Sequence, residues 1–211
     1  MSDPAELEDL YKRGELKRPT AALTELLNNP EKFLKTYPLS IDEHPGPSGV
    51  RTAYIGNGKV AKRPGTVLKT LRMHRTEAFE ISLIKAYGHS FPCQYVRMVP
   101  SNQDVDWYTL QAMPTIMLTC KLTGCSFVVR ENADGSIQVA HLQPKDETGI
   151  DLNKRLRVKG QVAYGRLSYN FESRQVSIVG VRSARGWQVF AQKVDKEKEV
   201  GIRSVHRIFP A

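Results

Sequence analysis

The residues of this sequence best suited to covalent chemistry are Cys125 and His141. A cysteine thiol is mostly protonated at neutral pH, so a nucleophilic cysteine needs a neighbour that takes its proton, and histidine does this well. Gly124 stands directly before the cysteine, where a missing side chain lets a substrate approach and lets the backbone bend. A lone cysteine on an apolar strand is more often a packing residue, so its interpretation as a nucleophile depends on these neighbours.

The turn between the two residues decides whether their side chains can meet. The segment Asn132-Ala133-Asp134-Gly135 fits a type I turn closed by a left-handed glycine, which pairs its first residue with Ser136. In that register Cys125 lies opposite Gln143, and His141 is a diagonal neighbour on the same face, within reach of a long side chain. A two-residue turn would shift the register by one and place the two side chains on opposite faces.

The motif Leu122-Thr123-Gly124-Cys125 resembles the Leu-Ser-Gly-Cys signature of the glutamine deamidase toxins, the Burkholderia lethal factor and the cytotoxic necrotizing factors. Their motif continues with a strand, a turn and a histidine a dozen or more residues on, as His141 does here. The Burkholderia factor and the chemoreceptor-modifying deamidases also place a threonine six residues before the cysteine, the position of Thr119. The resemblance covers residues 116–142 and departs at Thr123, where the added methyl would narrow substrate access slightly.

The resemblance implies a Cys125–His141–Thr119 triad that converts a glutamine side chain of a host protein to glutamate through a thioester. Thr119 would orient His141 through its hydroxyl or carbonyl, and Gly124 and Thr123 would border the substrate. It also implies a virulence effector that is secreted without a cleavable signal peptide and acts in the host cytoplasm. This chemistry needs no metal and no organic cofactor.

Two other functions remain open at this point. A transglutaminase or thiol protease would share the acyl-enzyme step and differ in the acceptor or in the bond attacked. A non-catalytic basic binding module would make no use of Cys125. Cys120 lies on a strand without a preceding glycine, and we assign it to the core. Cys120, Cys125 and His141 lack the fourth ligand that a structural zinc site requires.

The first part of the chain has a helical pattern. Apolar residues repeat at helical spacing from Pro4 to Tyr37, interrupted by Pro19 and Pro30, with Thr20 and Asn29 as expected caps. The densest run of helix and strand breakers follows at 44–49. We therefore predict a helical appendage at residues 1–45 and a cysteine-dependent catalytic domain at 46–211.

The rest of the chain has mostly strand-like patterns. We predict a hairpin around Asn57-Gly58, with strands at Val50–Ile55 and Lys59–Ala61, and one helix at Thr76–Tyr87. Further strands are predicted at Gln94–Val99, Thr115–Thr119, Ser126–Arg130, Ile137–Leu142, Gln161–Leu167, Gln175–Val181, Trp187–Lys193 and Ser204–Phe209. Such closely spaced strands leave no room for helical crossovers, which favours an α+β fold with a mainly antiparallel β-sheet or sandwich and a few flanking helices.

Composition places the chain among ordinary globular proteins. The 211 residues include 31 Lys and Arg against 22 Asp and Glu, a net charge of +9, which should attract acidic partners. We find no basic recognition helix, finger spacing or aromatic strand motif, so nucleic acid is an unexpected partner. No apolar run is long enough to span a membrane, and three cysteines do not make a disulfide scaffold. We expect a monomer with reduced thiols.

Overall fold

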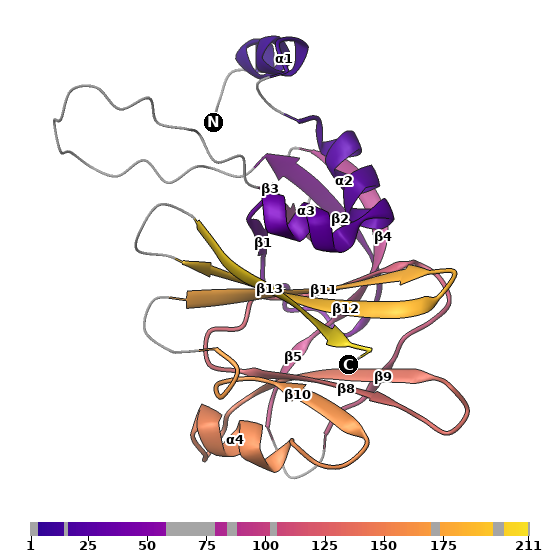
Figure 1. Ribbon diagram of the computed structural model, residues 1–211, viewed down its shortest axis with the longest axis vertical. Helices are drawn as coiled ribbons and strands as arrows, with labels where there is room; N and C mark the ends of the chain where they lie inside the picture. Colours follow the sequence, from indigo (N-terminus) through magenta and orange to yellow (C-terminus); the bar gives the residue numbers. More distant parts are fainter. Residues whose placement is uncertain are drawn as a thin grey trace, which may run out of the picture.

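The protein is built from two β-sheets packed face to face, with helices on both outer faces (Figure 1). The computed structural model describes residues 4–14, 17–57, 79–83, 88–101, 105–169, 174–195 and 201–210. Helices α2 (Pro19–Asn28) and α3 (Pro30–Thr36) cover the outer face of an eight-stranded sheet, and helix α4 (Gly149–Arg155) covers the outer face of a five-stranded one. The predicted α+β fold with mainly β content is therefore confirmed.

Three short helices form the start of the chain: α1 (Pro4–Lys12), α2 (Pro19–Asn28) and α3 (Pro30–Thr36). Asn29 caps α3 as predicted, because its side-chain oxygen accepts a hydrogen bond from the Lys32 amide at 3.3 Å. The prediction of Thr20 as a cap is wrong. Pro19 takes the first helical position, where proline needs no hydrogen-bonded N–H, so Thr20 already lies inside the helix and Arg18 precedes it.

The eight-stranded sheet has the order β1-β3-β2-β4-β7-β11-β12-β13. Its strands are β1 (Leu39–Ile41), β2 (Gly49–Asn57), β3 (Phe79–Ser82), β4 (His89–Val96), β7 (Ile116–Thr119), β11 (Arg174–Ser183), β12 (Gly186–Asp195) and β13 (Gly201–Phe209). Most neighbours are antiparallel, and the pairs β1–β3 and β4–β7 are parallel. Strand β2 confirms the first arm of the predicted hairpin, while Lys59–Ala61 lies outside the described residues.

The predicted helix at Thr76–Tyr87 is wrong where the structure describes it. Phe79–Ser82 forms β3, paired with β1 on one side and β2 on the other. Phe79 and Ile81 are buried and Glu80 between them is exposed, an alternation with a period of two. Two neighbouring strands satisfy the backbone of this segment, which outweighs its local helical pattern. The parts 76–78 and 84–87 lie outside the described residues.

The five-stranded sheet carries the residues of chemical interest. Its strands are β5 (Met98–Pro100), β6 (Tyr108–Thr109), β8 (Ser126–Glu131), β9 (Ile137–Gln143) and β10 (Gln161–Tyr164), and α4 (Gly149–Arg155) packs on it. The turn between β8 and β9 is the predicted one. The Asn132 amide donates to the Ser136 carbonyl at 2.9 Å, and Gly135 has a φ of 79°. Phe127 therefore lies opposite His141, in the predicted register.

Three layers of apolar side chains hold the sheets and helices together. The first lies between the N-terminal helices and the eight-stranded sheet, the second between the two sheets, and the third beneath α4. Ala22, Leu26 and Phe33 of α2 and α3 share the first layer with Tyr95 and Val179 of the sheet. The boundary at residue 45 remains a prediction, but the described residues on either side of it contribute to one core.

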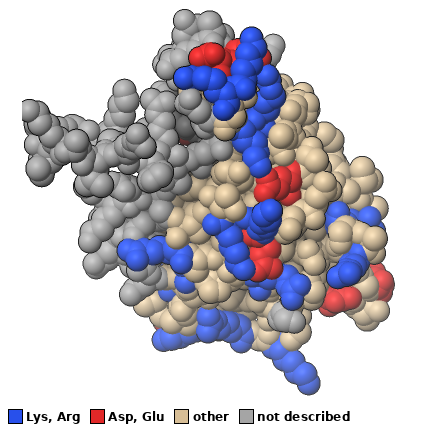
Figure 2. Space-filling model, turned by 45° about the horizontal axis from the view of Figure 1, so that its top comes forward, with Lys and Arg blue, Asp and Glu red and all other residues tan. Residues whose placement is uncertain are grey.

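The basic side chains of the described residues do not gather in a single patch on the visible face of the molecule (Figure 2). On the face shown in Figure 2, lysine and arginine side chains form several separate groups, some of them beside acidic side chains. Exposed ion pairs such as Arg18–Glu8 and Lys35–Glu31 contribute little to stability. The net charge of the whole chain is +9. Within the described part of the chain, no helix is long and apolar enough to cross a membrane.

Candidate active site

Thr119 and His141 meet between the two sheets. Thr119 ends β7 in the eight-stranded sheet, and His141 lies on β9 in the five-stranded sheet. The Thr119 Oγ1 and His141 Nδ1 atoms are 2.7 Å apart, and both side chains are completely buried. The structure therefore brings these two predicted site residues together. The hydroxyl fixes the orientation of the ring, whichever partner holds the hydrogen.

The other ring nitrogen of His141, Nε2, is buried and has no hydrogen-bond partner among the described residues. A buried polar atom without a partner is costly, and such atoms are often kept for function. In the tautomer whose Nδ1–H donates to Thr119, Nε2 carries a free lone pair. That nitrogen is then available to accept a proton.

Cys125 lies just before the first residue of β8 and is 5% exposed. Its thiol donates to Met98 Sδ at a sulfur–sulfur distance of 3.3 Å. Met98 pairs with His141 in the parallel β5–β9 register, so thiol, thioether and imidazole converge on one part of the sheet. Among the hydrogen bonds of the described residues, none joins Cys125 Sγ to His141, so the structure does not show the predicted contact between these two side chains.

The face that Cys125 occupies is the predicted one. Phe127 follows Cys125 by two residues and lies directly opposite His141. Cys125, Phe127 and Val139 all belong to the apolar layer between the sheets, whereas Val128 and Ala140 point to α4. Side chains two residues apart on a strand share a face, so Cys125 and His141 both point between the sheets.

Burial determines the protonation of both groups. It raises the pKa of the Cys125 thiol to about 11, although backbone hydrogen bonds from Thr123 and Gly124 favour the thiolate. Complete burial lowers the pKa of the His141 imidazole to about 3. Both groups are therefore uncharged at neutral pH. A reaction at this site would begin from a neutral thiol and a neutral imidazole rather than from an ion pair.

The buried imidazole makes stability depend on pH. Unfolding exposes His141 and returns its pKa to the usual 6.5. Between about pH 6.5 and pH 3 the unfolded chain binds a proton that the folded chain excludes, so the free energy of unfolding falls as the pH is lowered. One such proton contributes a slope of up to about 1.4 kcal/mol per pH unit. Urea unfolding between pH 7.5 and 5 should give a steeper loss for wild type than for His141→Gln. Equal slopes would contradict a neutral buried imidazole.

The backbone around the cysteine is held from one side and open on the other. The Tyr169 hydroxyl donates to the Cys125 carbonyl oxygen at 2.8 Å. A Cβ atom built on Gly124 would have no atom within 4 Å, and Thr123 is exposed. A Cβ on Gly149 would instead lie 2.5 Å from the Gly124 carbonyl oxygen, because the start of α4 packs directly on this backbone. The backbone that precedes Cys125 is therefore open on the side of Gly124 and Thr123.

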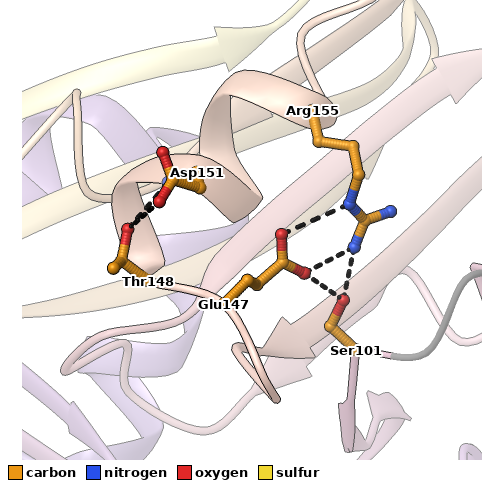
Figure 3. A network of polar contacts seen from close by, with 5 residues as sticks. All are labelled: Ser101, Glu147, Thr148, Asp151 and Arg155. Atoms are coloured by element: carbon orange, nitrogen blue, oxygen red, sulfur yellow. Dashed lines mark hydrogen bonds and ion pairs between the residues drawn. The ribbon is translucent and has the colours of Figure 1, made fainter.

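A polar network holds the start of α4 in place (Figure 3). Arg155 Nη2 and Ser101 Oγ donate to the same carboxylate oxygen of Glu147, at 2.7 and 2.9 Å. The hydrogen bond from Arg155 holds the pKa of Glu147 below its usual value. Thr148 caps α4 by accepting from the Asp151 amide at 3.1 Å. The network joins α4 to the end of β5, so it also fixes the segment that packs on Gly124.

Two cysteines remain outside the proposed triad. Cys120 is buried, as expected of a core residue, and its Sγ lies 3.7 Å from His141 Nδ1. Burial raises the pKa of the Cys120 thiol to about 12. It raises the pKa of Cys93 to about 12 as well, in the apolar layer between the N-terminal helices and the eight-stranded sheet. In the part of the chain that the structure describes, no group of three or more His, Cys, Asp or Glu side chains could hold a metal ion.

Sequence reasoning did not find Met98, Tyr169 or Arg166. Met98 reaches the cysteine through the parallel β5–β9 pairing, and the other two lie in the turn after β10, the strand that pairs with β8. Neither pairing comes from a short hairpin, so no local turn signal points to it.

No protein-family model matches the chain, and no curated protein is significantly similar to it in sequence.

Proposed function

We propose that the protein is a glutamine deamidase that uses Cys125 as nucleophile, His141 as base and Thr119 to orient the base. One observation carries the proposal: the 2.7 Å contact of Thr119 Oγ1 with His141 Nδ1, which leaves Nε2 buried and unbonded on the face shared with Cys125. A threonine, a cysteine six residues later and a histidine on the next strand are also the positions that resemble the deamidase toxins.

The reaction follows from these groups. The thiol proton passes to His141 Nε2 as the sulfur adds to the carbon of a glutamine carboxamide, and the carbonyl electrons move to its oxygen. The oxyanion collapses, the C–N bond breaks, and the imidazolium protonates the departing nitrogen, which leaves as ammonia. Water then hydrolyses the thioester with His141 as base. The products are a glutamate side chain and the original thiol.

The neutral resting state fits this order of events. Because the pKa of Cys125 is about 11 and that of His141 about 3, proton transfer must accompany attack on the carbonyl carbon. The sulfur must also leave Met98, which is partly exposed beside it. A substrate side chain entering past Gly124 would displace the thioether. The thiol would then turn toward the ring.

The substrate in this proposal is a host protein reached after secretion, as the resemblance implies. The net charge of +9 favours a target with an acidic surface around its glutamine.

Mass spectrometry of a host-cell lysate tests the function. Wild-type protein should produce Gln-to-Glu conversion at defined sites, with matching ammonia release, whereas Cys125→Ser should produce neither. Cys93→Ser is the matched control. Cys93 is also a buried cysteine, but it lies in the apolar layer between the N-terminal helices and the eight-stranded sheet, so its substitution should leave the conversion intact. Conversion by Cys125→Ser at the wild-type rate would refute the proposal.

The same experiment separates the other functions. With an added primary amine, a transglutaminase would attach the amine to the glutamine, and a thiol protease would release new chain termini. A binding module would yield none of these Cys125-dependent products. Each of those outcomes would replace deamidation as the function.

A further inference from the structure

Arg166 lies in the turn that follows β10. β10 runs antiparallel to β8, and the last pair of that ladder is Tyr164 opposite Phe127. The chain turns at Gly165, whose carbonyl oxygen accepts a hydrogen bond from the Ser168 amide at 2.7 Å. Arg166 therefore comes from the turn that directly follows the strand paired with β8.

Close packing of the neighbouring residues holds this turn against the starts of β8 and α4. A Cβ on Gly165 would lie 2.1 Å from Ser126 Oγ, so these two residues are in direct contact one step beyond the ladder. A Cβ on Gly149 would lie 2.6 Å from Arg166 Cγ and 3.4 Å from its Nε. The stem of Arg166 thus packs on Gly149, which itself packs on the Gly124 carbonyl.

The charged groups around Cys125 give Arg166 a distinct role. His141 on β9 stays neutral, and Glu43, in the segment after β1, opposes the thiolate, as Cys120 and Tyr169 would if ionised. Arg166 is half-buried, and its positive charge favours an anion at the sulfur. Burial lowers the pKa of this guanidinium, but an arginine keeps its charge in proteins.

We propose that Arg166 stabilises negative charge at Cys125, first on the sulfur and then on the oxyanion that forms when the sulfur adds to a carboxamide. The bonds made and broken are those of the deamidation already described, and Arg166 exchanges no proton. Stabilisation of the oxyanion by Arg166 rests on the proposed function. Stabilisation of the thiolate does not, because the rate at which Cys125 reacts with any electrophile measures it.

Alkylation of Cys125 by iodoacetamide tests the inference. The rate at Cys125 is followed by peptide mapping from pH 6 to 10 in wild type, Arg166→Met, Arg166→Lys and Arg157→Met. Methionine keeps an apolar stem to pack on Gly149 without the charge, and lysine keeps the charge. Arg157 is an exposed arginine that donates to Ser168 Oγ at 3.1 Å, in the same turn as Arg166, and it serves as the control.

The charge should decide the outcome. At pH 8, Arg166→Met should be alkylated about tenfold more slowly than wild type, with the pH profile moved upward by about one unit. Arg166→Lys should recover most of the rate, and Arg157→Met should match wild type. Thermal unfolding verifies that each variant is folded, and Arg166→Gln replaces the methionine variant if that one is not.

Two results would overturn the inference. An unchanged profile in the uncharged variants would remove the electrostatic role, and a lysine variant as slow as the methionine variant would assign the effect to packing. The wild-type protein could lack deamidase activity while the alkylation rates of the variants still follow the expected order. That result would refute the proposed function and leave the role of Arg166 at the thiolate intact. The two proposals therefore fail separately.

Discussion

His141→Gln should lower the rate of glutamine deamidation by about three orders of magnitude. The variant keeps a polar side chain of similar size beside Thr119 Oγ1, but it has no group that can take the thiol proton. General bases contribute factors of about 10² to 10⁴, and removing one member of a nucleophile–base unit disables the others. The measurement is ammonia release on the protein substrate that the lysate experiment identifies. Cys125 should remain alkylatable at high pH, where it ionises without help.

A second histidine provides the control for this variant. His44 is half-buried in the segment after β1, where its backbone amide contacts the Tyr95 hydroxyl, outside the triad. His44→Gln should retain activity close to that of wild type. Near-normal turnover in a folded His141→Gln protein would show that another group removes the thiol proton, and the assignment of the triad would be wrong.

Gly149→Ala should both destabilise the protein and slow the reaction. The added methyl would lie 2.5 Å from the Gly124 carbonyl oxygen, closer than Cβ atoms occur, and backbone must move to admit it. Overpacking of this kind costs about 1–3 kcal/mol, which exceeds the advantage of up to about 1 kcal/mol that alanine has over glycine in a helix. Movement of the Gly124 carbonyl displaces Cys125, and a shift of about 1 Å can cost about 100-fold in rate.

Gly124→Ala is the matched comparison. A Cβ there has no neighbour within 4 Å, so its free energy of unfolding should stay within about 0.5 kcal/mol of the wild-type value. Its deamidation rate should still fall, because the methyl stands where the substrate approaches. Chemical unfolding and ammonia release separate the two effects. A Gly149→Ala protein as stable and active as wild type would contradict the close packing of α4 on the nucleophile loop.

Local signals in the sequence predicted the central hairpin correctly. Asn132 to Gly135 specify one turn, the turn specifies one register, and the register places Cys125 and His141 on one face. The pairing of Thr119 with His141 came instead from the resemblance to the deamidase toxins. It joins two sheets that no short-range pattern connects.

Predictions failed where tertiary packing overrides local preference. The segment around Phe79 has a helical pattern, but its place between β1 and β2 makes it a strand. α4 was missed because seven residues are too few for a clear helical period. Met98 reaches Cys125 through a strand pair that is remote in sequence, and Arg166 lies in the turn after β10, whose partner β8 is also remote in sequence. A pattern in one segment therefore carries no information about them.

The contact between Thr119 and His141 bridges two separate sheets, so the thickness of the sandwich sets its length. That thickness depends on buried side chains such as Met117, Val139 and Val176, none of which belongs to the triad. Protein interiors are packed densely enough for a single methylene to be felt. The apolar side chains between the sheets therefore set the distance between Thr119 and His141. Smaller side chains at these positions would slow any activity that depends on this histidine, although every reactive group would still be present.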